Sequence, residues 1–291
     1  MERVVEISDR PVFVSLHRGF LKVQEKNEEV GSVPLADIGV VIITGTMASL
    51  SAAIMAALME QGTPVVICGD NYHPTGMMLP VVGHFQQTKI IKRQIDASEP
   101  FKKRLWQKIV QTKIQHQARV LEDCGKDATG LRAMMNRVRS GDPDNIEARA
   151  AREYWPLLLG QNFRRQGDDP INGALNYGYA VIRAHVARSL VACGLQPALG
   201  IHHDNAGNPF CLADDMIEIY RPYVDKVVFD LESGGFEAID TEVKRNLIAV
   251  LNQDIKIAGD TSTVANAILR TCQSLARAFE IREPDIIYPA F

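Results

Sequence analysis

DNYHPTGMMLPVVGHF, from residue 70 to residue 85, marks the point where the character of the chain changes. Before it come short β-branched and aromatic runs separated by turn-forming residues: RVVEI, PVFVSL, GFLKV, GVVIITG and TPVVICGD. After it come segments with helical apolar spacing, over residues 101–123, 144–160, 172–194, 212–220, 241–253 and 261–279. The sequence therefore predicts an α+β fold, with a small β-rich domain over residues 1–86 and a larger all-helical domain over residues 87–291.

One helix is expected inside the β-rich part. Residues 46–61 are rich in Ala, Met and Leu, follow a Gly-Thr pair that can cap a helix, and stop at Gly62. The strand, helix, strand order suggests a nucleotide-binding unit, but TGT around Gly45 is not the GxGxxG fingerprint. A dinucleotide site is therefore not expected.

The composition is that of a globular protein that can bury a core: 291 residues, 46% hydrophobic and 23% charged. MERVVEISDR has no apolar signal-peptide core, and no run approaches the ~20 apolar residues that cross a membrane. We therefore expect a cytoplasmic location and no membrane partner. The five cysteines contain no CxxC pair, so they are interpreted as buried thiols.

Basic residues are concentrated in one segment although the whole chain has a net charge of -3. The segment from residue 89 to residue 119 has only two acids, Asp96 and Glu99, against nine basic residues: Lys89, Lys92, Arg93, Lys102, Lys103, Arg104, Lys108, Lys113 and Arg119. Such a distribution suits a polyanion bound on one face. The alternative is a solvated helix face whose counter-charges lie elsewhere in the fold.

Two adjacent histidines precede three acids in GIHHDNAGNPFCLADDMIEIYRP, residues 200–222. On a helical projection Asp214, Asp215 and Glu218 lie opposite the apolar sector that contains Leu212 and Met216. These acids could bind a metal ion, or they could form a solvated helix face. If residues 201–204 are extended, the two histidine side chains point to opposite sides and cannot share an ion.

A further carboxylate, Glu147, lies in GDPDNIEARAAREYW. Asp142 is expected to be the N-cap of this helix and Pro143 its first residue. The small residues around Glu147 allow another element to approach closely. Ala151, four residues later, offers no cation for a surface ion pair. The pattern favours a carboxylate at a packed junction.

Three stretches together resemble the CRISPR-associated integrase family, CRISPR-associated protein one: IEARAAREYW, PINGALNYGYAVIRA and GIHHDNAGNPFCLADDMIEIYRP. The resemblance implies a catalytic metal triad of Glu147, His203 and Glu218, with Asp215 as a nearby acid that some relatives use. Asp214 departs from the family pattern and leaves the choice of the extra acid open. The Leu-Ala-Asp-Asp run looks closest to the type II branch.

The resemblance implies a metal-dependent DNA integrase and endonuclease. Such an enzyme joins the 3′-hydroxyl ends of new spacer DNA to the leader-proximal CRISPR repeat by transesterification. Carboxylates favour Mg²⁺ or Mn²⁺, and an imidazole ligand shifts the preference toward Mn²⁺. Two alternatives remain open, a metal-dependent DNA nuclease of repair or recombination and a non-catalytic DNA-binding scaffold.

The resemblance also implies partners. These are double-stranded DNA, a second copy of the chain bound through the N-terminal dimerisation domain, and a dimer of the smaller second adaptation protein bridging two homodimers. The type II effector nuclease is a further candidate. Basic side chains are expected to hold the DNA and polar ones to orient a phosphate: Lys102, Lys103, Lys108, Arg149, Arg152, Arg164, Arg165, Asn172, Asn176 and Tyr177.

Overall fold

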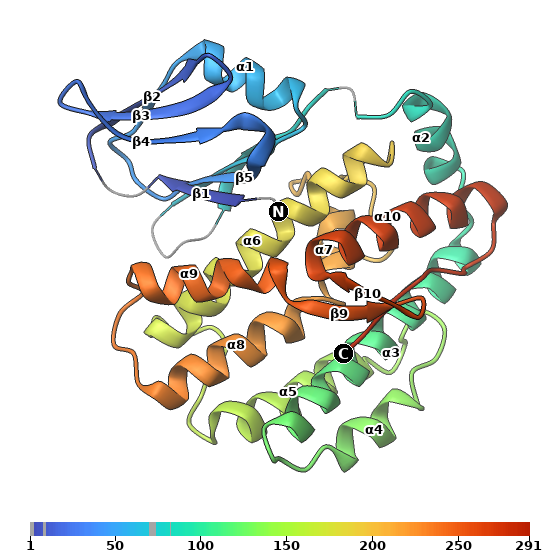
Figure 1. The fold of residues 1–291 in the computed structure, drawn as a ribbon. Helices are drawn as coiled ribbons and strands as arrows, with labels where there is room; N and C mark the ends of the chain where they lie inside the picture. The colour runs from blue at the N-terminus through green and yellow to red at the C-terminus, as the bar shows by residue number, and fades with distance from the viewer. Residues whose placement is uncertain (1–2, 8–9, 70–73, 82) are drawn as a thin grey trace.

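The computed structural model describes residues 3–7, 10–69, 74–81 and 83–291. In Figure 1 a β-rich N-terminal part, in blue, lies beside a larger helical part that runs from green to red. This arrangement confirms the α+β prediction. The first helix of the larger part begins at Gln87.

Two four-stranded sheets form the β-rich part, in the orders β1-β5-β7-β8 and β4-β3-β2-β6. Their strands are β1 Arg3–Ile7, β2 Val12–His17, β3 Phe20–Glu25, β4 Glu28–Pro34, β5 Ile38–Ile43, β6 Ser49–Leu50, β7 Val65–Cys68 and β8 Pro74–Met78, with a 3-10 turn η1 at Leu35–Asp37. Strand β5 is the fully buried IGVVII run. Its side chains alternate between two cores: Val41 and Ile43 face the β-rich core, whereas Val40 and Ile42 face the helical part. The first sheet therefore lies between the two cores.

The helix of the β-rich part, α1, covers Ala52–Glu60, so its expected start near Thr46 is wrong. Ser49 and Leu50 instead pair with β2 as the short strand β6. The actual cap is Ser51, whose hydroxyl oxygen accepts a hydrogen bond from the Ile54 amide at 3.4 Å.

Helix α6 occupies the middle of the helical part, where it packs against α7, α8, α9 and α10 and against strand β5 (Figure 1). The helices are α2 Gln87–Ile95, α3 Glu99–Asp123, α4 Thr129–Met135, α5 Ile146–Leu159, α6 Pro170–Ala192, α7 Cys211–Ile217, α8 Arg221–Gly234, α9 Thr241–Ala249 and α10 Val264–Ile281. The Asp169 carboxylate caps α6 by accepting from the Asn172 amide, and Pro170 opens the helix.

The larger domain is not all-helical, because a three-stranded sheet of order β10-β9-β11 lies within it. Its strands are β9 Asp254–Ile257, β10 Asp260–Thr263 and β11 Pro289–Ala290, preceded by the 3-10 turn η3 at Val250–Asn252. The helix expected over residues 261–279 therefore begins as a strand. Both turn residues between β9 and β10, Ala258 and Gly259, have positive φ, which is the geometry of a tight hairpin.

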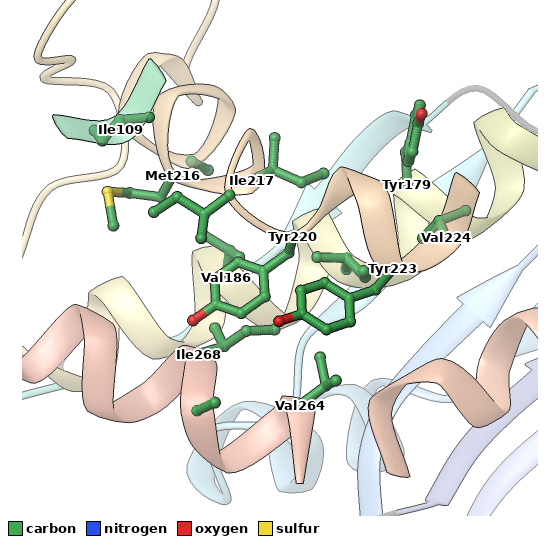
Figure 2. Packing of buried hydrophobic residues seen from close by; sticks show 14 of the residues in the cluster. Ile109, Tyr179, Val186, Met216, Ile217, Tyr220, Tyr223, Val224, Val264 and Ile268 are labelled. Atoms are coloured by element: carbon green, nitrogen blue, oxygen red, sulfur yellow. The ribbon is translucent and has the colours of Figure 1, made fainter. Parts of the chain in front are cut away.

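The apolar face predicted for residues 212–220 is confirmed by burial. Figure 2 shows Met216, Ile217 and Tyr220 in one cluster with Val186 of α6 and Ile268 of α10. The Tyr220 hydroxyl also lies 2.7 Å from Thr271 Oγ1. This packing fixes the segment that carries the acids.

All five cysteines are free thiols, and only Cys124 is partly exposed. None of the helices in the part of the chain that the structure describes is long and apolar enough to cross a membrane.

Candidate active site

Glu147 and Glu218 come together around one cation, the ammonium of Lys113. The Lys113 Nζ atom lies 2.5 Å from Glu147 Oε1 and 2.5 Å from Glu218 Oε2. The three side chains come from α5, from the turn between α7 and α8, and from α3. Only 9% of the Lys113 side chain and 6% of that of Glu218 is exposed, whereas 25% of the Glu147 side chain is exposed, so this ion cluster is largely buried and reaches the surface at Glu147.

Glu147 is placed by the way α5 begins. The Asp142 carboxylate accepts hydrogen bonds from the Ile146 amide at 2.9 Å and the Glu147 amide at 3.0 Å. The N-cap position itself is Asn145, in the left-handed conformation, so Asp142 caps from three residues upstream and Pro143 precedes the helix. Asp142 therefore caps the helix as expected, but it does so from outside the N-cap position, and Pro143 is not the first helical residue. This cap fixes Glu147 in the first helical turn.

Glu218 follows the last residue of α7, and Arg221 opens α8 three residues later. Arg221 Nε lies 3.0 Å from Glu218 Oε1. Burial by itself opposes the charged form of Glu218, but Arg221 and Lys113 outweigh it, so the pKa of this carboxyl is lowered. Glu218 is therefore kept as a buried anion with a cation on each side.

Lys113 was grouped with the basic segment by sequence and its role was missed. Burial opposes its charge, but Glu218 and Glu147 outweigh burial and raise the pKa of the ammonium. The missed signal is its position on α3. At about 100° per residue, Lys113 lies within roughly 60° of Trp106 and Val110 on the buried face of the helix. A lysine on the apolar face of a helix needs an internal anion.

Asp215 is fully buried, and its carboxylate organises the turn that carries the histidines. It accepts from the amides of Ile201 at 2.6 Å, His202 at 3.0 Å and His203 at 3.1 Å. Oδ1 also accepts from His203 Nδ1 at 2.7 Å, and this contact raises the pKa of the imidazole. Both oxygens are thereby used. The contacts give Asp215 the role of orienting His203 and provide no support for direct metal ligation.

Gly200 allows this turn to wrap so closely. A Cβ at this position would lie 2.1 Å from the His203 carbonyl oxygen and 3.1 Å from Asp215 Oδ2. Any larger residue would push the histidine turn off the carboxylate.

The two histidines do not point to opposite sides, because residues 201–203 curl around Asp215 instead of running extended. Both rings contact Trp106. His202 stacks on the indole with centroids 4.2 Å apart, and His203 meets it edge-on at 5.8 Å. His202 therefore packs against the protein, and His203 is held by Asp215. The expected role of His203 as a metal ligand stays a prediction.

Asp214 faces Arg183 of α6. Arg183 donates Nε at 2.6 Å and Nη2 at 2.9 Å to the two Asp214 oxygens, and Asn208 donates to one of them at 2.7 Å. Neither of the paired acids is a solvated surface group. The alternative interpretation of this segment, a solvated acidic face, is therefore wrong for Asp215 and Glu218, which are buried.

The donor chemistry of the cluster fits a divalent cation. Among the described residues no three His, Cys, Asp or Glu side chains lie close enough together to hold a metal ion. Two of the expected ligands, however, already share a cation, and Glu218 Oε2 is buried against Lys113 without a well-oriented hydrogen bond. The Nδ1 atom of His203 is used by Asp215, so Nε2 is the nitrogen it can offer. Oxygen donors with one imidazole suit Mg²⁺ or Mn²⁺.

A cleft of about 710 Å³ opens beside the ion cluster, with Arg165, Asn176 and Arg221 in its wall. Arg165 donates to Asn172 Oδ1 at 2.9 Å and to Asn176 Oδ1 at 2.8 Å. The buried Asn172 also donates its amide to the Arg164 carbonyl, so it holds protein groups instead of facing a ligand. Tyr177 is likewise buried and donates to Glu6 Oε2 at 3.1 Å. The contacts of Asn172 and Tyr177 thus give no support for direct DNA contact, which stays a prediction.

Both arginines of the cleft lie over one aromatic ring, that of Tyr179, at 5.2 Å for Arg165 and 4.8 Å for Arg221. The Tyr179 hydroxyl donates to the buried carboxylate of Asp225, which also accepts from the Tyr154 hydroxyl at 3.0 Å. Asp225 thus anchors the surface on which the two guanidinium groups rest.

The remaining basic candidates do not face the carboxylates. Arg149 and Arg152 are exposed on α5 at about 200° and 140° around the helix from Glu147. Arg164 donates to the carbonyls of Gln161 and Phe163.

The three lysine candidates lie along α3. Lys103 is exposed, and Lys108 lies about 140° around the helix from Lys113. Lys102 shares the face of Lys113 but lies about 16 Å away along the helix axis. Any DNA that they hold must extend beyond the ion cluster.

Comparisons with known proteins cover most of the chain. Residues 5–256 match the family model described as CRISPR associated protein Cas1. A protein named CRISPR-associated endonuclease Cas1, from Neisseria meningitidis serogroup C (strain 8013), is 44% identical over 248 residues, which cover 84% of this chain and 81% of the relative.

Two solved structures are similar in three dimensions. A casposase bound to integration product aligns with a TM-score of 0.84 and 20% identity, over 98% of this chain and 92% of that chain. A Cas6-RT-Cas1--Cas2 complex aligns with a TM-score of 0.78 and 19% identity, over 98% of this chain and 35% of that chain. At these identities the two structures show a shared fold.

Proposed function

The chain belongs to the family of CRISPR-associated protein Cas1, and from that membership we propose that it is a metal-dependent DNA integrase and endonuclease of spacer acquisition. Its reaction joins the 3′-hydroxyl ends of new spacer DNA to the leader-proximal repeat. The name of the Neisseria relative supports the endonuclease activity. The casposase that shares the fold was captured with an integration product, which supports strand joining.

The observation that carries the proposal is the convergence of Glu147 and Glu218 on a single cationic atom in a largely buried site. Two carboxylates that share a cation, together with an imidazole oriented by Asp215, support a donor set of the kind that phosphoryl-transfer centres use. A solvated acidic surface would have neither the burial nor the shared cation.

We assign the chemistry as follows. Glu147, Glu218 and Nε2 of His203 would hold a Mg²⁺ or Mn²⁺ ion, which would supply Lewis-acid stabilisation of the phosphodiester and favour deprotonation of the attacking hydroxyl. Asp215 fixes the ring orientation of His203 and keeps the proton on Nδ1. The DNA 3′-hydroxyl attacks the phosphorus atom, the 3′-oxygen of the cut repeat strand leaves, and no bond to the protein forms.

The arginine cleft is proposed to hold the DNA backbone near this centre. Arg221 contacts both Glu218 and the Tyr179 ring, and Arg165 shares that ring. Guanidinium groups bind phosphate oxygens well because they donate two parallel hydrogen bonds. Asn176, which lines the cleft and accepts from Arg165, orients this side chain.

The proposed assembly contains double-stranded DNA, a second copy of the chain and a dimer of the smaller adaptation protein. Exposed apolar side chains on three neighbouring strands of the β-rich part, Phe13, Phe20 and Val30, support dimerisation through that part. The Cas1--Cas2 complex that shares the fold supports the smaller partner. The 44% sequence identity with the Neisseria protein, which comes from a type II system, supports the type II branch. The type II effector nuclease remains a proposed partner.

The test is a strand-transfer reaction with purified smaller partner, labelled spacer DNA, a leader-repeat duplex and Mn²⁺ or Mg²⁺. Joined product that disappears with EDTA and with Glu147→Gln supports the integrase. A repair nuclease would leave cut strands and no joined product. A DNA-binding scaffold would bind the duplex and produce neither.

A further inference from the structure

The strongest unexplained feature of the site is that its cation is already present as part of the chain. Glu147 and Glu218 each carry one negative charge, and Lys113 and Arg221 each carry one positive charge. The ion pairs that join these four groups are 2.5 Å, 2.5 Å and 3.0 Å long. The cluster is therefore electrically neutral without any added ion.

A neutral cluster has a consequence for the binding of a divalent ion. Adding Mg²⁺ or Mn²⁺ would leave two uncompensated positive charges in a poorly solvated place, which is strongly unfavourable. The excess can be removed in two ways: the Lys113 ammonium can withdraw from the carboxylates, or an anionic phosphate can enter with the metal. A withdrawn ammonium can pair with that phosphate.

On the basis of the proposed function, we infer that Lys113 is an internal counter-ion that competes with the divalent metal and thereby makes metal binding depend on DNA phosphate. Without DNA the lysine holds Glu147 and Glu218 together and keeps metal affinity low. With DNA in place the phosphate supplies the missing negative charge, and metal and DNA bind cooperatively. Lys113 is a positioning residue of the carboxylate pair in this scheme.

The contacts favour Lys113 over Arg221 as the competing group. Lys113 alone touches both carboxylates, and it approaches from the buried side of α3. Arg221 touches only Glu218 and also lies over the Tyr179 ring, so it can stay in place when the metal binds. Glu218 Oε2, the oxygen next to the ammonium, has no well-oriented hydrogen bond that a metal would have to replace.

The experiment is a Mn²⁺ titration of the full-length protein in which free Mn²⁺ is followed by electron paramagnetic resonance, with and without duplex DNA. It compares the wild type with Lys113→Met. The matched control is Lys226→Met, which removes an ion-paired lysine of α8 outside the cluster. Thermal unfolding of each protein is recorded in EDTA and in Mn²⁺.

Without DNA, Lys113→Met should bind Mn²⁺ on the order of 10-fold more tightly than the wild type, because a competing charge is gone. Lys226→Met should behave as the wild type does. DNA should tighten Mn²⁺ binding to the wild type much more than to Lys113→Met. In EDTA, Lys113→Met should unfold at a lower temperature, because the buried Glu218 and the partly buried Glu147 lose their shared counter-ion, and Mn²⁺ should restore its stability.

Two failures are distinguishable. Equal or weaker Mn²⁺ binding by Lys113→Met, with normal binding by the wild type, would overturn the role of Lys113 and leave the metal-dependent function standing. Absence of Mn²⁺ binding by every protein, with or without DNA, would overturn both. If Lys113→Met does not fold even in Mn²⁺, Lys113→Gln, which keeps a hydrogen-bond donor and removes the charge, is titrated in its place.

Discussion

Glu218 and Asp225 are two buried carboxylates seven residues apart, and the structure treats them in opposite ways. Glu218 lies between two cations, and its pKa is lowered because Arg221 and Lys113 overcome the effect of burial. Asp225 accepts from two tyrosine hydroxyls, and burial raises its pKa to about 6. Glu218 is kept charged at the place where we propose that a metal ion replaces Lys113. Asp225 is a structural anchor that tolerates a proton.

Within one short stretch of chain, Glu218 has the surroundings of a reactive carboxylate and Asp225 those of a structural one. Neighbouring cations preserve the negative charge that a metal ligand needs. Hydroxyl donors satisfy an acid without providing a full charge, which suits an anchor beneath the arginine cleft. The following predictions test that division, from the largest effect to the smallest.

The largest effect is expected on strand-transfer activity, from substitutions of the two histidines at residues 202 and 203. His203→Asn should lower the rate of metal-dependent strand transfer more than 100-fold, because the proposed metal ligand is lost and the loss of a ligand costs more than the loss of a residue that supports one. His202→Asn should keep most of the activity, since its ring only stacks on Trp106. Both are assayed at saturating Mn²⁺ after circular dichroism confirms folding. The opposite ranking would move the ligand to His202.

A smaller effect, on stability, is expected at Asp215. Asp215→Asn puts an amide N–H group where the carboxylate now accepts from backbone amides and His203 Nδ1, so donors face donors. The free energy of unfolding in urea should fall by about 2 kcal/mol. Asp214→Asn, which loosens only a partly exposed pair with Arg183, should cost less, about 1 kcal/mol or below. Equal losses would show that the turn does not depend on Asp215.

The free energy of unfolding should depend on pH through Asp225. Its carboxyl takes up a proton near pH 6 in the folded chain and near its ordinary pKa of 3.8 when unfolded. Its contribution to stability therefore rises as the pH falls through about 6 and stops rising below 3.8. Relative to Asp225→Asn, the wild type should gain up to about 1.4 kcal/mol per pH unit in that window. Parallel stability curves for the two proteins would contradict the raised pKa.

The smallest effect concerns the lysines of α3. Lys102→Glu, Lys103→Glu and Lys108→Glu should each flatten the log–log dependence of duplex binding on salt by about 0.9 for every phosphate contact that is lost. Lys256→Glu, on strand β9, serves as the control for a general change in charge. Slopes identical to that of the wild type would place the DNA away from this helix.

Local patterns predicted most of the helices and the β-rich N-terminal part, and the family resemblance singled out Glu147 and Glu218 as candidate ligands. Apolar spacing correctly predicts that Met216 and Ile217 are buried, and Asp142 correctly indicates that a helix begins near residue 146. Residues 261–263 were wrongly expected to be helical, and no strand was expected at residues 254–257, because their hairpin depends on two left-handed residues, Ala258 and Gly259, and on pairing with β11.

The contacts within the candidate site could not be predicted from the sequence, because they also depend on segments far apart in the chain. The charge of Lys113 is obvious in the sequence, but its direction is set by packing of α3 against α5 and α8, which brings together residues far apart in the chain. The wrapping of residues 201–203 around Asp215 likewise depends on contacts that a strand pattern does not contain. The family resemblance named Glu147, His203 and Glu218 as candidates, and tertiary packing determines which groups they contact.

The central claim, that Glu218 is a charged metal ligand and Asp225 a structural acid, is tested most directly by one strand-transfer assay on two neutral variants. Glu218→Gln and Asp225→Asn are compared with the wild type at saturating Mn²⁺, with folding verified by circular dichroism. The account predicts that Glu218→Gln loses joined product by more than 100-fold whereas Asp225→Asn stays within about tenfold of the wild type. Near wild-type joining by Glu218→Gln would contradict it.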